Sequence, residues 1–260
     1  MSRPGVADRP PSPAVEDYLK GIYALEERDG PPAASTELAQ RLGVGVSSVS
    51  GMVRRLSDAG LVAHRRYGGL ALTPEGRRAA RAVLRRHRLV ETYLVEALGY
   101  RWDEVHDEAE VLEHAVSDRL VSAIDDRLGH PRRDPHGDPI PEPDGSLPPE
   151  QLRPLDALGD GDRARLVRVF DAPAELLRRL AGEGITLGAE IDLVGRDRDG
   201  ALLVRLGDPP RIVALPPGTA ATLRVSPPDA PGPDPAVACA PACEVPAAEA
   251  DRSGGAGMSG

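Results

Sequence analysis

The chain has 260 residues, enough for two small domains with additional tails, and its aromatic content of one Phe, one Trp and five Tyr leaves the core to Leu, Val, Ile and Ala. No apolar run reaches the roughly 18 residues of a membrane span, and Met1–Pro13 has no charged-then-apolar signal pattern, so we expect a protein that is neither secreted nor membrane-spanning. The two cysteines, Cys239 and Cys243, lie in a Pro/Ala-rich tail and do not indicate a disulfide framework.

The net charge of −9 is unevenly distributed along the chain. Residues 36–88 contain eleven Arg and three acids, a balance of +8, whereas residues 103–126 contain nine acids and one Arg, a balance of −8. Blocks of opposite sign predict surfaces with different partners. We expect the first block to meet a polyanion such as DNA and the second to hold cations.

The first predicted element is a helix that follows a polar, Pro-rich arm at residues 1–13. Ser12-Pro13 is typical of a helix start, with Ser as the N-cap and Pro in the first turn. Apolar residues at positions 15, 18, 19, 22 and 25 have the spacing of a helix with one buried face. The sequence Asp29-Gly-Pro-Pro predicts the end of this helix.

A winged helix is predicted over residues 14–74. Two short helices, one closed by Gly43 and the next capped near Gly45–Ser47, have the spacing of a helix-turn-helix. The basic segment Leu61–Thr73 then predicts a β-hairpin that turns at Gly68-Gly69.

The remainder of the chain predicts a helical unit over residues 75–130, a Pro-rich linker over 131–161 and a small antiparallel barrel over 162–226. The helical unit would consist of a long helix from Thr73 to about Leu98 and a second helix from about Trp102 to Leu128. The barrel would have one helical insert, Ala174–Ala181, and five strands: Ala164–Phe170, Glu190–Val194, Ala201–Leu206, Arg211–Leu215 and Ala221–Val225. We expect residues 227–260 to be disordered.

A run of His and Glu residues in the second of these helices has the spacing of a metal-binding face. On one continuous helix, four residues would share one side at i, i+4, i+7 and i+8: His106, Glu110, Glu113 and His114. Imidazole and carboxylate ligands together suit a borderline-to-hard divalent cation, whereas a sulfur-rich set would favour zinc or copper.

A second pair, His87 and Glu91, has i, i+4 spacing on the preceding predicted helix. Acidic helix faces are more often simply solvated, and a lone His is usually a surface or core residue. Two neighbouring helices that both carry ligand-like pairs nevertheless favour a metal site.

The second helix of the predicted helix-turn-helix would face DNA with small hydroxyl side chains and Arg. Hydroxyls reach base edges or phosphates, and a guanidinium group neutralises a phosphate. We expect DNA contacts from six residues of this helix and the wing: Ser47, Ser48, Ser50, Arg54, Arg65 and Arg66. Helix-turn-helix patterns also occur in protein-docking modules, but the +8 balance would be self-repulsive without a polyanion.

Four segments of the chain resemble the diphtheria toxin repressor family of metal-dependent regulators, and the resemblance extends over about residues 15–225. These segments are Tyr18-Leu-Lys-Gly-Ile-Tyr-Ala-Leu-Glu-Glu, Arg86-His-Arg-Leu-Val-Glu, Val105-His-Asp-Glu-Ala-Glu-Val-Leu-Glu-His-Ala-Val-Ser-Asp and Gly137-Asp-Pro-Ile-Pro. The stretch Leu180–Gly188 resembles the SH3-like (FeoA-like) barrel of longer members. The resemblance implies a mainly α fold with a β wing, in which a winged helix-turn-helix and a helical dimerisation domain precede a small all-β SH3-like barrel.

The same resemblance implies a cytoplasmic, homodimeric repressor that binds a palindromic operator in double-stranded DNA, without a membrane or an organic cofactor. It also implies two metal sites. The residues of the primary site would be Asp17, Glu110, Glu113 and His114, and those of the ancillary site would be His87, Glu91 and His106. In some members the barrel completes the ancillary site; here Pro173 and Leu176 fall at those positions, and Asp171 and Glu175 are the nearest substitutes.

The resemblance further indicates the metal. Iron-responsive members have Met and Cys where this chain has Asp17 and Glu110, whereas manganese-responsive members have Asp and Glu. An oxygen-rich ligand set suits the hard ion Mn²⁺, with Fe²⁺ as the alternative. The shorter manganese regulators carry a second acid at the position of Lys20, so the ancillary site of the longer members is a better guide than their two-ion arrangement.

Two other functions are consistent with parts of the sequence. One is a winged-helix regulator controlled by an organic ligand, in which the acids form only a solvated face. The other is a metallohydrolase that uses Glu110, Glu113 and His114, but the chain has no His-Glu-x-x-His helix and no glycine-rich phosphate loop. The Cys239/Cys243 pair, without a nearby His, is interpreted as incidental.

Overall fold

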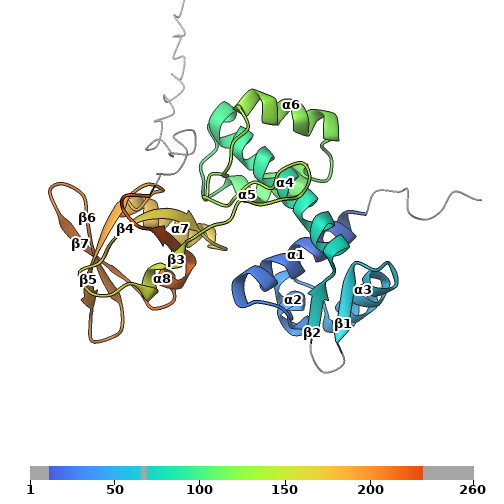
Figure 1. Cartoon of the computed structure of the whole chain (residues 1–260), viewed down its shortest axis with the longest axis horizontal. Helices are drawn as coiled ribbons and strands as arrows, with labels where there is room; N and C mark the ends of the chain where they lie inside the picture. Colours follow the sequence, from blue (N-terminus) through green and yellow to red (C-terminus); the bar gives the residue numbers. More distant parts are fainter. Residues whose placement is uncertain (1–11, 66–68, 231–260) are drawn as a thin grey trace, which may run out of the picture.

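The computed structural model describes residues 12–65 and 69–230, and it consists of two α-rich units and one β-rich unit (Figure 1). The long helix α4 runs from the first unit into the second, and the β-rich unit lies to one side of both. None of the helices that the structure describes combines the length and apolarity needed to cross a bilayer.

The first unit is a winged helix, as the sequence predicts. Its elements are α1 (Pro13–Asp29), α2 (Ser35–Arg41), α3 (Val46–Asp58), β1 (Val62–Arg65) and β2 (Gly69–Leu72). The predicted apolar faces of the helices meet in one core around Leu19, Leu38 and Leu56, none of which is appreciably exposed. The antiparallel pairing of β1 with β2 forms the wing, and Ala33 pairs with Leu70 to fix the wing against the start of α2.

The second unit begins with α4 (Pro74–Leu98), whose N-cap Thr73 accepts a hydrogen bond from the backbone N–H of Gly76 at 3.0 Å. The single helix predicted from Trp102 to Leu128 is wrong, because the chain forms two helices, α5 (Val105–Leu112) and α6 (Asp118–Leu128). The side chain of Ser117 caps α6 by accepting from the backbone N–H of Leu120, and this competing start ends the first helix. Glu113 and His114 therefore lie in the turn that directly follows α5, where Glu113 keeps helical backbone geometry and its N–H bonds to the carbonyl of Ala109.

The segment that we interpreted as a linker packs closely against both neighbours. Ile140 joins the core of the helical unit, while Asp134 and His136 are buried. The carbonyl of His136 accepts from the backbone N–H of Val169 at 2.8 Å, which attaches the segment to the β-rich unit.

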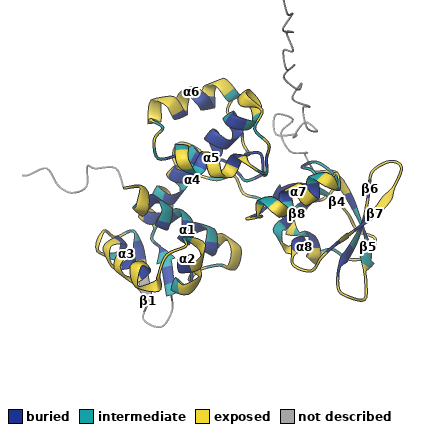
Figure 2. Cartoon of the chain, turned by 180° about the vertical axis from the view of Figure 1, so that it is seen from behind, coloured by how far each residue is buried: buried dark blue, intermediate teal, exposed yellow. Residues whose placement is uncertain are grey.

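The β-rich unit is a six-stranded antiparallel sheet in the order β3-β8-β4-β5-β6-β7. Its strands are β3 (Arg153–Pro154), β4 (Arg163–Val169), β5 (Glu190–Arg196), β6 (Leu202–Leu206), β7 (Arg211–Leu215) and β8 (Leu223–Ser226), accompanied by the helices α7 (Ala174–Gly182) and α8 (Thr219–Thr222) and a 3₁₀ turn at Leu155–Ala157. The five predicted strands and the helical insert are confirmed, and β3 is an additional strand within the expected linker. Trp102, from the loop before α5, is buried in the core of this unit. Figure 2 shows buried residues along the strands of the unit and exposed residues in the loops between β5, β6 and β7.

Gly137 lies in the segment first interpreted as a linker, at a point where that segment packs against β4. Its φ of +83° is in the left-handed region, and a Cβ there would lie 2.1 Å from the carbonyl oxygen of Val167. Gly137→Ala should therefore lower the free energy of unfolding by more than the roughly 1 kcal/mol expected for the conformation alone. Chemical denaturation measures this loss. Gly129→Ala is the matched control, because Gly129 has a φ of +73° but open space around its Cβ position; equal losses in the two variants would contradict the prediction.

Candidate metal centre and DNA-facing surface

Three groups of His, Asp and Glu residues each bring potential ligand atoms within 4.8 Å of one another in the part of the chain that the structure describes. Cluster 1 contains Asp17, Glu113 and His114; cluster 2 contains His87, His106 and Glu110; and cluster 3 contains Glu91, Asp134 and His136. All of their donors are nitrogen or oxygen atoms, a set that suits a borderline-to-hard divalent cation.

Cluster 1 joins the winged helix to the helical unit. The Nε2 atom of His114 lies 2.9 Å from Asp17 Oδ1 and 3.5 Å from Glu113 Oε1. Its other ring nitrogen, Nδ1, lies 2.8 Å from Glu16 Oε2. Metal-binding histidines commonly use the second ring nitrogen in this way, which fixes the ring and aims the free nitrogen at the ion. Cluster 1 therefore fits a cation well.

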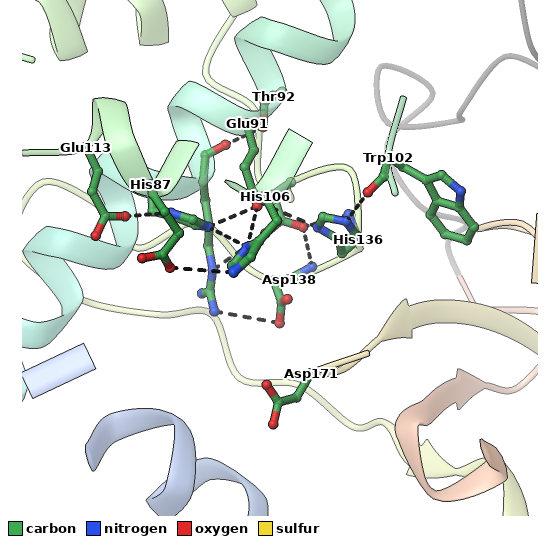
Figure 3. Close-up of polar contacts among 12 residues, drawn as sticks. His87, Glu91, Thr92, Trp102, His106, Glu113, His136, Asp138 and Asp171 are labelled. Carbon is green, nitrogen blue, oxygen red and sulfur yellow. Dashed lines mark hydrogen bonds and ion pairs between the residues drawn. The ribbon is translucent and has the colours of Figure 1, made fainter. Parts of the chain in front are cut away.

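Cluster 2 lies between α4 and α5. His87 Nε2 is 2.9 Å from Glu91 Oε1 and 3.1 Å from His106 Nδ1, and His106 Nε2 is 3.5 Å from Glu110 Oε1. The structure thus brings together His87, Glu91 and His106, the residues assigned to the ancillary site from the sequence. Figure 3 shows these side chains converging from the two helices.

Cluster 3 is fully buried and combines Glu91 of α4 with two residues of the segment that precedes the β-rich unit. His136 Nε2 lies 2.7 Å from the carbonyl oxygen of Trp102, an arrangement in which this nitrogen donates and Nδ1 faces Glu91 Oε2 at 3.6 Å. Asp134 Oδ1 accepts from the backbone N–H groups of His136 and Asp138, both at 2.9 Å. The two residues are therefore held in place by the loop itself.

Two carboxylates connect the three clusters into one network. Glu113 reaches His87 Nδ1 with its Oε2 atom at 2.5 Å while its Oε1 atom faces cluster 1. Glu91 faces His87 with Oε1 and His136 with Oε2. A cavity of about 860 Å³, bounded by all three units, is lined by Asp17 of cluster 1 and by all the residues of clusters 2 and 3. A change in charge at one cluster is therefore transmitted through shared ligands to the next.

The two candidate ligands from the β-rich unit have different surroundings. Asp171 lines the same cavity, but both of its oxygens accept from Arg41, at 2.8 and 2.9 Å, and Figure 3 shows it apart from the network of dashed contacts. Glu175 has a side chain that is 81% exposed and pairs with Arg178 at 3.3 Å. The structure does not bring Glu175 to any of the clusters.

The network raises the pKa values of its buried histidines. Burial alone would lower the pKa of His87, but the carboxylates of Glu91 and Glu113 outweigh it and raise that pKa to about 9. Burial also tends to lower the pKa of His136, but the Glu91 carboxylate outweighs this effect and raises that pKa to about 10. Burial and the nearby Asp138 and Glu91 carboxylates raise the pKa of Asp134 to about 7.

These pKa values predict that metal binding releases protons. Imidazole nitrogens must lose their protons before they coordinate an ion, and at neutral pH both His87 and His136 are below their pKa values of about 9 and about 10. Affinity for an ion that either histidine binds should therefore rise with pH up to the pKa of that histidine, about 9 for His87 and about 10 for His136. Isothermal titration calorimetry at pH 7 should give binding heats that depend on the ionisation enthalpy of the buffer. His130→Gln, at a side chain outside the clusters, should leave that dependence unchanged, and buffer-independent heats in the unmodified protein would contradict the prediction.

The DNA-facing candidates on α3 are all exposed. Ser47, Ser48, Ser50 and Arg54 lie opposite the buried Val49, Val53 and Leu56. Arg55 is exposed beside them and adds a second positive charge. Arg65 belongs to β1, but its side chain, like the whole of Arg66, lies outside the described residues.

The basic block divides into two parts with different roles. Several of the Arg residues of α4 pair inside the protein: Arg77 with Glu26, Arg85 with Asp125 at 2.7 Å, and Arg86 with Glu16. The pairs of Arg77 and Arg86 join α4 to α1, and that of Arg85 joins α4 to α6, so among the described side chains these three charges are already neutralised while Arg54 and Arg55 of α3 are exposed.

Sequence reasoning named every residue of clusters 1 and 2, but it assigned Glu110 to the primary site, whereas the structure groups Glu110 with His87 and His106. It did not name the partners that the fold adds. Glu16, which orients His114, is one residue from the predicted Asp17 and has no distinguishing spacing. Asp134 and His136 lie in the expected linker, where their alternation in Asp134-Pro-His-Gly-Asp was the only available signal. Their burial depends on contacts with α4 and β4, which are distant in sequence.

Comparison with known proteins agrees with this arrangement. Residues 12–70 match the family model described as iron dependent repressor, N-terminal DNA binding domain, and residues 73–142 match the iron dependent repressor, metal binding and dimerisation domain. Residues 153–227 match the FeoA domain.

Individual proteins extend the likeness over most of the chain. The diphtheria toxin repressor of Corynebacterium glutamicum is 36% identical over 190 residues, which are 69% of this chain and 83% of that protein. The transcriptional regulator MntR of Geobacillus kaustophilus is 36% identical over 107 residues, 41% of this chain and 74% of that protein. A solved manganese-dependent transcriptional repressor in complex with manganese is 46% identical, with a TM-score of 0.77 over 81% of this chain and 98% of the other. The chain therefore belongs to the diphtheria toxin repressor family of metal-dependent transcriptional repressors.

Proposed function

We propose that this repressor responds to Mn²⁺, with Fe²⁺ as the alternative ion, and that it binds palindromic operator DNA as a homodimer to control genes of metal homeostasis. The observation that carries the proposal is the meeting of Asp17, on the first helix of the winged unit, with His114 of the helical unit at 2.9 Å. We place its action in the cytoplasm, where the DNA lies, and assign it a regulatory rather than a catalytic role.

Cluster 1, with the neighbouring Glu110, would hold the activating ion. Its oxygen-rich donors favour Mn²⁺ over ions that prefer sulfur, and the manganese complex of a 46% identical repressor supports that choice. An ancillary ion has two alternative donor sets that share Glu91: His87 with His106, or Asp134 with His136. Asp171 would join the second set only by leaving Arg41.

The residues of cluster 1 explain how metal would control DNA binding. Asp17 belongs to the same helix that packs against α2 and β2 of the winged unit, whereas Glu113 and His114 follow α5. A bound divalent ion supplies positive charge that relieves the repulsion among these carboxylates. Asp17 and His114 then fix α1, and with it α3, relative to the helical unit. Because metal favours this arrangement, DNA that favours it must increase metal affinity by the same factor.

Exposed apolar side chains of the helical unit would contact the second copy of the chain. Leu98, Val111 and Leu120 are large apolar side chains that are exposed on α4, α5 and α6, and the matching family model is described as a metal binding and dimerisation domain. A twofold pairing through this face would place two α3 helices at a fixed separation, which requires an operator with matching symmetry.

The proposal predicts that Mn²⁺ controls DNA affinity through cluster 1. A duplex fragment is first selected from a random-sequence pool in the presence of Mn²⁺, and its affinity is then measured by fluorescence anisotropy with Mn²⁺ or with chelator. Mn²⁺ should strengthen binding of this fragment at least about tenfold, within the usual range of coupling between sites. Asp17→Asn should abolish most of that gain, because it removes one anionic ligand from the winged unit. Glu175→Gln, on an exposed carboxylate outside the clusters, should retain it. Equal affinity with Mn²⁺ and with chelator would contradict the proposal and favour a regulator that is governed by an organic ligand.

The proposed dimer face is testable separately. Combining Val111→Asp with Leu120→Asp places charge at side chains that are 72% and 47% exposed and should convert the dimer to monomer in sedimentation velocity. Operator affinity should fall at least about tenfold, because each monomer reads only a half-site. Ile212→Asp is the matched control, since Ile212 is 59% exposed but lies on β7. If the double variant remained dimeric, the interface would lie elsewhere.

A further inference from the structure

Lys20 has a position in the metal centre that the metal-binding proposal does not explain. Its Nζ atom lies 2.6 Å from Glu110 Oε1 and 2.7 Å from Glu113 Oε1, so one ammonium group bridges carboxylates of clusters 1 and 2. Lys20 lies on α1, one turn after Asp17. Its side chain is only 14% exposed, and that of Glu113 is fully buried, so solvent screens the pair weakly.

We propose that Lys20 acts as an internal counter-cation that competes with the divalent ion for Glu110 and Glu113, and thereby sets the metal concentration at which the repressor responds. This inference rests on the proposed function and identifies a residue that regulates the same site. Lys20 is a positioning residue, because it acts through the two carboxylates and not on the ion directly.

The competition follows from the number of charges within this small volume. A cation that approaches Glu113 must either share its oxygens with the ammonium group or displace that group, and in both cases it is repelled by a positive charge a few ångströms away. Without a bound ion, the same ammonium group neutralises the buried Glu113, whose other oxygen faces His87. Lys20 therefore stabilises the protein without metal and weakens the binding of metal.

Lys20 also occupies the space between clusters 1 and 2. Its ammonium group lies between Glu113 Oε1 and Glu110 Oε1, although the other oxygen of Glu113 still reaches His87 of cluster 2. While Lys20 remains, these two Oε1 atoms face its ammonium group and are not free to hold an ion between the clusters. A single positive charge from the chain thus replaces part of the charge that a second ion would supply.

The test compares the uncharged variants Lys20→Met and Lys20→Gln with the charge-conserving variant Lys20→Arg. Affinity for Mn²⁺, measured by isothermal titration calorimetry at constant pH, should rise at least about tenfold in both uncharged variants and change little in Lys20→Arg. The Mn²⁺ concentration for half-maximal binding of the selected DNA fragment should fall by a similar factor. Thermal unfolding in chelator should occur at a lower temperature in Lys20→Met than in the unmodified protein. Arg211→Met is the control, since Arg211 pairs with Glu183 at 2.9 Å on the β-rich unit.

The outcomes separate this inference from the proposed function. If the unmodified protein binds neither Mn²⁺ nor Fe²⁺, the proposed function fails. If it binds Mn²⁺ but both uncharged variants bind with unchanged or weaker affinity, the role of Lys20 as a competitor is wrong and the proposed function stands. A rise in affinity that Lys20→Arg shows equally would also overturn the inference, because it would come from lost packing and not from lost charge.

Discussion

Glu113 is a carboxylate with no exposed side-chain surface, placed where α1, α4 and the turn after α5 meet. An isolated charge in such a position costs several kcal/mol, so it requires partners on every side. Those partners are Lys20 from the winged unit, His87 from α4 and the adjacent His114. The partners that neutralise this one group also bring the proposed metal ligands together, because His87 and His114 are themselves candidate ligands and Lys20 contacts Glu110.

A second buried carboxylate on α4, closer to the β-rich unit, needs charged partners for the same reason. Glu91 is buried between His87 and His136, and burial tends to raise its pKa, but these two rings hold the pKa of Glu91 well below its usual value. Arg168 of β4 is buried as well, and it pairs with Asp138 and, at 2.9 Å, with Glu27 of α1. Its guanidinium group lies 4.5 Å from the ring centre of Phe170, which shields these pairs from solvent. All three units are thus connected by alternating buried charges.

This connectivity has a consequence for regulation. A purely apolar interface between the units would be indifferent to ions, whereas an interface built from carboxylates and imidazoles changes its energy when a cation or a proton binds. Trp102 adds one apolar anchor, because it is buried in the core of the β-rich unit while its carbonyl oxygen accepts from His136. Movement of the cluster 3 loop is therefore coupled to the position of the β-rich unit.

The sequence by itself determined most of the elements and most of the residues that we propose as metal ligands. Apolar spacing predicted α1 to α4, and the five main strands followed from short β-like runs, because these patterns depend on local periodicity. Asp17, His87, His106 and His114 could be assigned from spacing and family resemblance, since a helix places such residues at fixed intervals. The break between α5 and α6 escaped this reasoning, because the Ser117 cap competes with a helical pattern that continues through it.

Only the tertiary structure decided which charges meet. The bridge from Lys20 to Glu110 and Glu113 joins residues 90 and 93 positions apart, and the contact of Asp171 with Arg41 spans 130 positions. No local pattern encodes such pairs, because they arise when separate units pack and each buried charge must find a partner. Glu110 and Glu113 remain neighbours at the end of α5, where both face Lys20. Packing between the units decides that Asp17 meets His114, whereas Glu110 meets His106 within α5.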